Sequence, residues 1–213
     1  MNIVPRIGVV LAAEPNEAQL DKYLSDLRDS LAGSSKQFIA FSLLVITALV
    51  TYHLVVYEGA TGLALNTVQL ADARLFRKVF LVVPSAMLAA AACIGYLRRC
   101  QREVYDYLTI SRYRVLGTTG LHELRLPADY ILGLFLLRTE GGAIGKAVST
   151  VVVLLSVAVF DVGPAVYIVH ATAENVALFG FRDLLTIVAG GIALLLSASS
   201  LVVIVLAARV KAT

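Results

Sequence analysis

The stretch 184-LLTIVAGGIALLLSASSLVVIVLAA-208 decides the fold class of this chain. It contains no charged residue, and a helix of this length, rising about 1.5 Å per residue, crosses a hydrocarbon layer of about 30 Å. Three other apolar stretches of comparable length lie at 37–57, 79–97 and 147–170. Four such stretches in one chain predict a protein whose solvent is lipid.

The composition agrees with a membrane environment. Hydrophobic residues make up 59% of the 213 residues, and the mean hydropathy of +0.83 lies well outside the range of soluble domains. We therefore expect an all-α integral membrane protein with four transmembrane helices and short amphipathic cytoplasmic helices. The expected parts are an N-terminal cytoplasmic segment at 1–36, two helices with an external loop at 37–97, a cytoplasmic loop with helices at 98–146, and two helices with a short tail at 147–213.

Basic residues are concentrated in alternate connections between the apolar stretches. Fourteen of the 18 Lys and Arg residues lie before the first stretch, between the second and third, or after the fourth. Because cytoplasmic segments carry the excess of Lys and Arg, we expect both termini and the middle loop in the cytoplasm. The pI near 8.9 then reflects orientation in the membrane, and no nucleic-acid partner is expected. Abundant Ala and Val, with Arg in excess of Lys, favour a bacterial inner membrane.

Residues 1–13 share some features with a secretory signal peptide. They carry one basic residue, a short apolar segment and small residues. The apolar segment has only about seven residues, which is the lower limit for a signal peptide. We therefore expect this segment to be retained.

Helical periodicity is also visible outside the four apolar stretches. Leu20, Leu27 and Leu31, with either Tyr23 or Leu24, form an apolar stripe that predicts an amphipathic helix over 14–32, ended by the sequence Gly33-Ser34-Ser35. We expect this stripe to pack on the middle loop or on a partner. The second apolar stretch is expected to kink at Pro84 and to continue as helix to about residue 113. A further short helix is predicted over 127–140, between a proline and a pair of glycines.

Asp161 is the most suggestive single residue, because a charged side chain within a span is costly and defaults to a functional candidate. Gly163 and Pro164 follow it and are expected to break the helix, so Asp161 either meets water there or acts within the span. His53 lies at a similar depth in the first span by the helical rise. A His53–Asp161 pair would be a proton-sensitive gate or a polar clasp between helices.

Small residues recur every four positions on three of the predicted spans. Such stripes let helix backbones approach closely in lipid, where packing drives association. They predict helix packing within the bundle or between copies. The residues are Ala189, Ala193 and Ser197 on the fourth span, Ser85 and Ala89 on the second, and Gly145 and Ser149 on the third.

The middle loop begins with arginines interleaved with tyrosines. This composition is typical of a cytoplasmic interfacial belt, and it is also suited to an anionic ligand or to lipid headgroups. The candidate contacts are Arg98, Arg99, Arg102, Arg112 and Arg114. His122-Glu123 lacks a third ligand at metal spacing, and the chain contains no HExxH, P-loop or dinucleotide motif, so neither a metal nor a cofactor is expected.

These features favour a non-catalytic four-span protein that assembles as a homo-oligomer or as a subunit of a membrane complex. Its expected partners are the lipid bilayer and either itself or another membrane or cytoplasmic protein. One alternative is an oligomeric ion channel or pore gated through the Arg/Tyr-rich loop. A small membrane enzyme is the second alternative, although no residue constellation supports catalysis.

Overall fold

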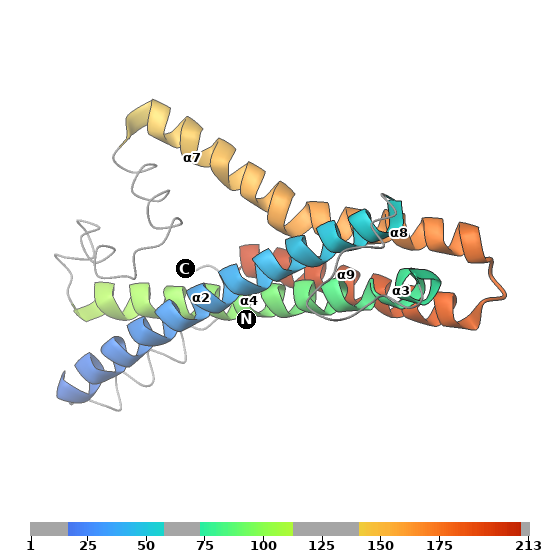
Figure 1. Cartoon of the computed structure of the whole chain (residues 1–213). Coiled ribbons are helices and arrows are strands. Elements are labelled where there is room, and N and C mark those ends of the chain that lie inside the picture. The colour runs from blue at the N-terminus through green and yellow to red at the C-terminus, as the bar shows by residue number, and fades with distance from the viewer. Residues whose placement is uncertain (1–16, 58–72, 113–140, 210–213) are drawn as a thin grey trace. The chain divides into compact units, whose positions relative to one another are not determined.

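A computed structural model describes residues 17–57, 73–112 and 141–209, and within these ranges the chain is helical and contains no strand (Figure 1). Four helices are long and apolar enough to cross a membrane, which confirms this part of the predicted fold class. The signal-peptide alternative at 1–13 and the predicted helix at 127–140 lie outside the described residues. The helices are α2 (Glu17–Tyr57), α3 (Ala73–Val79), α4 (Val82–Arg112), α7 (Gly142–Val157), the π-helix η2 (Ala158–Val162), α8 (Gly163–Phe179) and α9 (Leu184–Arg209).

The helices divide into two compact units built from segments that are distant in sequence. Unit 1 contains the described residues of Met1–Phe38, Ile94–Leu155 and Ile204–Thr213. Unit 2 contains those of Ile39–Cys93 and Ser156–Val203. Each unit has its own cluster of buried apolar side chains.

In unit 1, the predicted leucine stripe of α2 packs against the part of α4 that extends beyond the apolar stretch. Leu24, Leu27 and Leu31 are buried in a cluster with Tyr105 and Leu108. This confirms that the second helix continues past residue 97, and it ends at Arg112, close to the expected position. Leu24 therefore occupies the stripe, while Tyr23 is 51% exposed.

The predicted helix end at Gly33-Ser34-Ser35 is wrong, because α2 continues through this sequence to Tyr57. The Ser34 hydroxyl lies 3.0 Å from the Leu31 carbonyl oxygen and 3.0 Å from Oε1 of Gln101 on α4. Gln101 Nε2 in turn donates to Ser30 Oγ at 2.7 Å. These contacts with α4 outweigh the cost of a helical glycine, which is about 1 kcal/mol relative to alanine.

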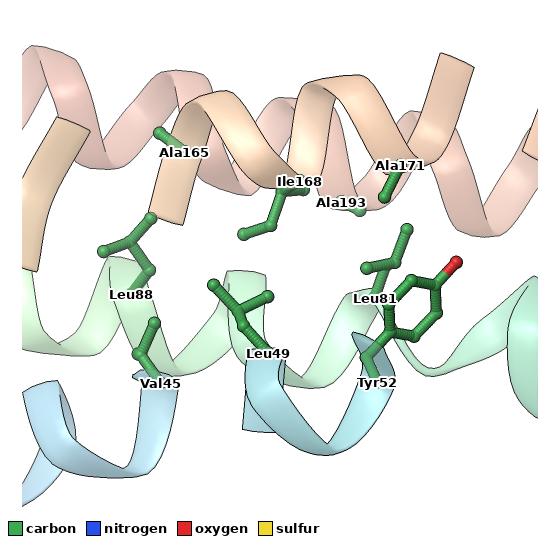
Figure 2. Close-up of a cluster of buried hydrophobic side chains, with 9 residues drawn as sticks. All are labelled: Val45, Leu49, Tyr52, Leu81, Leu88, Ala165, Ile168, Ala171 and Ala193. Carbon is green, nitrogen blue, oxygen red and sulfur yellow. The ribbon is translucent and has the colours of Figure 1, made fainter. Parts of the chain in front are cut away.

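In unit 2, α2, α4, α8 and α9 surround a second apolar core (Figure 2). Leu49 and Ile168 point toward one another from α2 and α8, and Ile168 is completely buried. Alanines on α8 and α9 let these two helices approach closely. The core consists of Val45, Leu49, Tyr52, Leu81, Leu88, Ala165, Ile168, Ala171 and Ala193.

Pro84 interrupts the second span as predicted. Helix α3 ends at Val79 and α4 begins at Val82, so Pro84 falls in the first turn of α4, where a missing N–H is tolerated. Pro84 has no N–H to donate to the Phe80 carbonyl, which instead accepts a hydrogen bond from Val83 N at 3.0 Å. In Figure 1, α3 is seen nearly end-on while α4 runs across the view.

The predicted helix break at Gly163-Pro164 is also wrong, because the helix widens into η2 and then continues as α8. The Gly163 N–H donates to the Ala158 carbonyl, five residues earlier, which is a π-type hydrogen bond. The next residue, Pro164, has no N–H to donate, and the helix continues past it. A Cβ at Gly163 would lie 2.7 Å from the Ala158 oxygen, so glycine is required here. Helix α8 ends at Phe179, and the following Gly180 has a φ of 80°, which suits a glycine.

At Gly190, α9 packs tightly against α8. A Cβ at Gly190 would lie 2.9 Å from Cγ2 of Thr172, whereas one at the adjacent Gly191 would meet nothing within 4 Å. Both Gly190 and Thr172 are buried. The pair offers a matched test of helix packing.

We expect Gly190→Ala to destabilise the protein by about 1–3 kcal/mol, because the added methyl group overpacks a β-branched side chain. Gly191→Ala should cause no loss, and Thr172→Ser, which removes Cγ2, should restore the stability of Gly190→Ala. The measurement is the free energy of unfolding in mixed micelles during denaturant titration. Equal stability of the two single alanine variants would contradict this packing.

Candidate functional site

His53 and Asp161, the predicted polar pair, are not joined by a hydrogen bond or an ion pair in the part of the chain that the structure describes. His53 Nδ1 instead lies 3.1 Å from the Tyr167 hydroxyl of α8, and its ring lies 4.8 Å from that of Tyr57. Asp161 lies within η2 and is partly buried. The structure therefore gives His53 a phenolic partner.

Asn175 is the centre of a polar network at one end of unit 2. It is 2% exposed, and its Oδ1 accepts a hydrogen bond from Arg77 Nε at 2.8 Å. Its Nδ2 donates to the Arg77 carbonyl at 2.9 Å and to the Tyr52 hydroxyl at 3.0 Å. One buried amide thus connects α8 to α3 and to α2.

Glu174, next to Asn175, extends the network toward the exposed side of α8. Its carboxylate accepts a hydrogen bond from the Tyr57 hydroxyl and lies 3.2 Å from His170 Nε2. The Arg77 guanidinium lies 5.7 Å from the centre of the Tyr57 ring, a cation–π geometry. Tyr57 thereby contacts both an acidic and a basic side chain.

Asp183 joins the α8–α9 turn to α3. Its carboxylate lies 2.8 Å from Lys78 Nζ and accepts a hydrogen bond from the Thr186 hydroxyl in the first turn of α9. The Asp183 carbonyl also accepts the Ile187 N–H at 3.1 Å, so Asp183 is the N-cap of α9. The hydrogen bond from Lys78, supported by that from Thr186, lowers the pKa of Asp183 below its ordinary value.

The predicted arginine contacts lie in unit 1 and are accompanied by acidic side chains. Arg99 pairs with Glu103, and Arg102 Nε lies 3.8 Å from the Asp106 carboxylate. Arg98 also interacts with the protein. The Arg112 side chain and Arg114 lie outside the described residues. An anionic headgroup at this surface would compete with these carboxylates.

The predicted small-residue stripes are largely buried within the chain. Ala189, Ala193 and Ser197 lie on the buried face of α9, together with Gly190. Gly145 and Ser149 are the buried residues of α7. Ser85 is completely buried and Ala89 is partly buried. Much of this close packing therefore serves contacts within one chain.

The network around Asn175 was missed in the sequence because the third apolar stretch was ended at residue 170. The stretch was predicted over 147–170, so Glu174 and Asn175 in the sequence 170-HATAEN-175 fall just beyond its end. The available signal was the helical spacing of His170 and Glu174, four residues apart on one face. Arg77 and Tyr52 could not be linked to it, because their proximity depends on how three helices pack.

No family model, curated protein or solved structure matches this chain. Within residues 17–57, 73–112 and 141–209, no three His, Cys, Asp or Glu side chains gather as metal ligands would. The Asn175 network joins α2, α3 and α8 through hydrogen bonds and holds the Arg77 guanidinium in place.

Replacing Asn175 with leucine should destabilise the protein by at least about 1–3 kcal/mol, since it leaves the buried Tyr52 hydroxyl and the Arg77 carbonyl without this partner. Thr51→Val is the matched control, because the Thr51 hydroxyl donates to the Thr47 carbonyl of its own helix at 2.8 Å and not to another helix among the described residues. The measurement is the unfolding free energy of both variants. A smaller loss for Asn175→Leu than for Thr51→Val would contradict the central role of Asn175.

The lowered pKa of Asp183 predicts a pH dependence of stability. Because the folded-state pKa lies below the unfolded value of about 3.9, the stabilisation is complete above that value and is lost as the pH falls through the folded-state pKa. The difference in thermal midpoint between the native protein and Asp183→Asn should therefore shrink on acidification from about pH 7 to about pH 2. A difference that stays constant over this range would show that the ionised carboxylate is not what stabilises the turn.

Proposed function

We propose that the protein is a non-catalytic, four-span membrane protein that assembles with itself or as a subunit of a membrane complex. The observation that carries the proposal is the low burial of its spans. In the most apolar window of each of the helices Gly142–Phe179 and Leu184–Arg209, only 17% of the residues are buried within the chain. Most of this apolar surface must therefore face lipid or another protein.

The exposed surface of α7 supports an assembly role. Ile144, Val148, Val151 and Leu155 recur at spacings of four, three and four residues, and all are exposed. This spacing is the one that places side chains along a single helix–helix seam. A second helix laid along this seam would bury apolar side chains without introducing a charge.

The polar network supports a structural role rather than a catalytic or conducting one. Asn175, Arg77 and Tyr52 satisfy one another across three helices. Two of the three serines of α9 bond to their own helix, Ser199 to the Leu196 carbonyl at 2.8 Å and Ser200 to the Ser197 carbonyl at 2.7 Å. Groups satisfied in this way are suited to holding helices together.

The proposed orientation places both termini and the middle loop in the cytoplasm of a bacterium, with the protein in the inner membrane. The excess of basic residues in alternate connections supports it. The other connections then face outward, and the Asn175 network lies near the outer surface with Arg77 and Lys78. Basic side chains at that level suit lipid phosphates.

Native mass spectrometry of the whole protein in nanodiscs tests the proposal. We expect a homo-oligomer, or a species that is stable only with a second polypeptide, and we expect Asp161→Asn to leave both the mass and the ion flux of proteoliposomes unchanged. A protein that is monomeric at all concentrations and recovers no second polypeptide would contradict assembly. A closed ring whose ion flux changes in Asp161→Asn would favour the channel instead.

A further inference from the structure

A groove of about 370 Å³ lies in unit 2 between α2 and the η2–α8 segment. Leu49, Val50 and Leu54 line it from α2, and Pro164 lines it from α8. Leu49 and Pro164 are buried, whereas Val50 and Leu54 are exposed, so the groove has a packed base and an open rim. Its volume lies at the lower end of the range of small-ligand sites, which is about 300–1,000 Å³.

The π-helix shapes one wall of this groove. Gly163 lines it without a side chain, and the backbone geometry excludes any larger residue there, since a Cβ would lie 2.7 Å from the Ala158 oxygen. Turns of this type occur mainly as single bulges and frequently at functional sites. The wall at Gly163 is therefore formed by the backbone.

The lining is apolar except for one hydrogen-bonding pair, His53 and Tyr167. The distance from His53 Nδ1 to the Tyr167 hydroxyl is 3.1 Å. The His53 ring also lies against Tyr57, and the Tyr167 ring meets Tyr52 edge-on at 6.4 Å between ring centres. Neighbouring aromatic rings thus hold both members of the pair in place.

The pair offers the same chemistry in either tautomer of the neutral imidazole. If the Tyr167 hydroxyl donates to Nδ1, then His53 retains an Nε2–H donor and the phenol oxygen still accepts. If Nδ1–H donates to Tyr167, the phenol O–H is the free donor and Nε2 accepts. One donor and one acceptor remain in both cases, and a single hydroxyl group matches them.

We propose that this groove binds a single-tailed membrane lipid with an uncharged hydroxyl head, which bonds to His53 and Tyr167 while the tail lies along Leu49, Val50 and Leu54. The lining residues carry no formally charged side chain other than histidine, so an ionised head would lose hydration without an opposite charge. The volume accommodates one chain. The site is independent of the assembly proposed above.

The absence of tryptophan from the native sequence allows a direct test. Leu54→Trp places a fluorophore at the groove, and Leu43→Trp is the control, because Leu43 is an exposed residue of α2 that does not line it. Each variant in nanodiscs is titrated with a fatty alcohol brominated near its head and with the bromoalkane of equal chain length. We expect saturable quenching only for Leu54→Trp with the alcohol.

The head-group contacts are tested by adding Tyr167→Phe to Leu54→Trp, after checking that the thermal midpoint is retained. We expect the saturable component to be lost, leaving quenching that rises in proportion to the lipid content. Should Tyr167→Phe not fold, the comparison of alcohol with alkane in Leu54→Trp remains decisive.

Three results would overturn the proposal. The first is equal saturable quenching by the alkane, which would show that the groove takes any chain. The second is stronger saturation by a brominated fatty acid in its ionised form, which would indicate an anion site. The third is quenching by the alcohol that never saturates, together with a dimer that Leu54→Trp dissociates, which would mean that the groove seats a second copy of the chain.

Discussion

The hydrogen bonds between Asn175 and Arg77 are the contacts on which the rest of unit 2 depends. Helix α3 ends at Val79, so the Arg77 carbonyl is one of the last four of its helix and has no partner further along that helix. Asn175 Nδ2 supplies the missing donor, and Oδ1 binds the side chain of the same arginine. Arg77 therefore links α3 to α8, and the hydrogen bond from Asn175 to Tyr52 links α2 to the same network.

Two prolines create the geometry that this network stabilises, and they do so in different ways. Pro84 falls in the first turn of a new helix, so the chain turns at Phe80 and Leu81 and α3 becomes a separate element. Pro164 falls in the first turn of α8, directly after the π-helix, so its missing N–H is tolerated and the span continues. The end of α3 before the first proline leaves the Arg77 carbonyl for Asn175. The second produces the groove wall beside Tyr167.

Four apolar stretches, the leucine stripe of α2 and the interruption at Pro84 could all be predicted because each depends on local spacing. The continuation of α2 through Gly33 could not, since contacts with Gln101 of α4 decide it. A pairing of His53 with Asp161 was inferred from depth alone. Depth follows from the helical rise, but the direction of a side chain also depends on rotation, and one extra residue in a π-type turn rotates the following helix by about 100°.

The distribution of polar groups in unit 2 explains how specificity can arise on a surface made mainly of valine and leucine. Apart from Asp161 in η2, the charged side chains of unit 2 gather at one end, where Asp183 pairs with Lys78 and Glu174 lies beside His170. Elsewhere the spans expose apolar side chains, which can select among the hydrocarbon groups that contact them only by shape. His53 and Tyr167 border both regions, because their rings contact Tyr57 and Tyr52 and both residues line the groove. A molecule arriving from the lipid therefore meets its directional contacts at this pair, and recognition there depends on donors and acceptors as well as on fit.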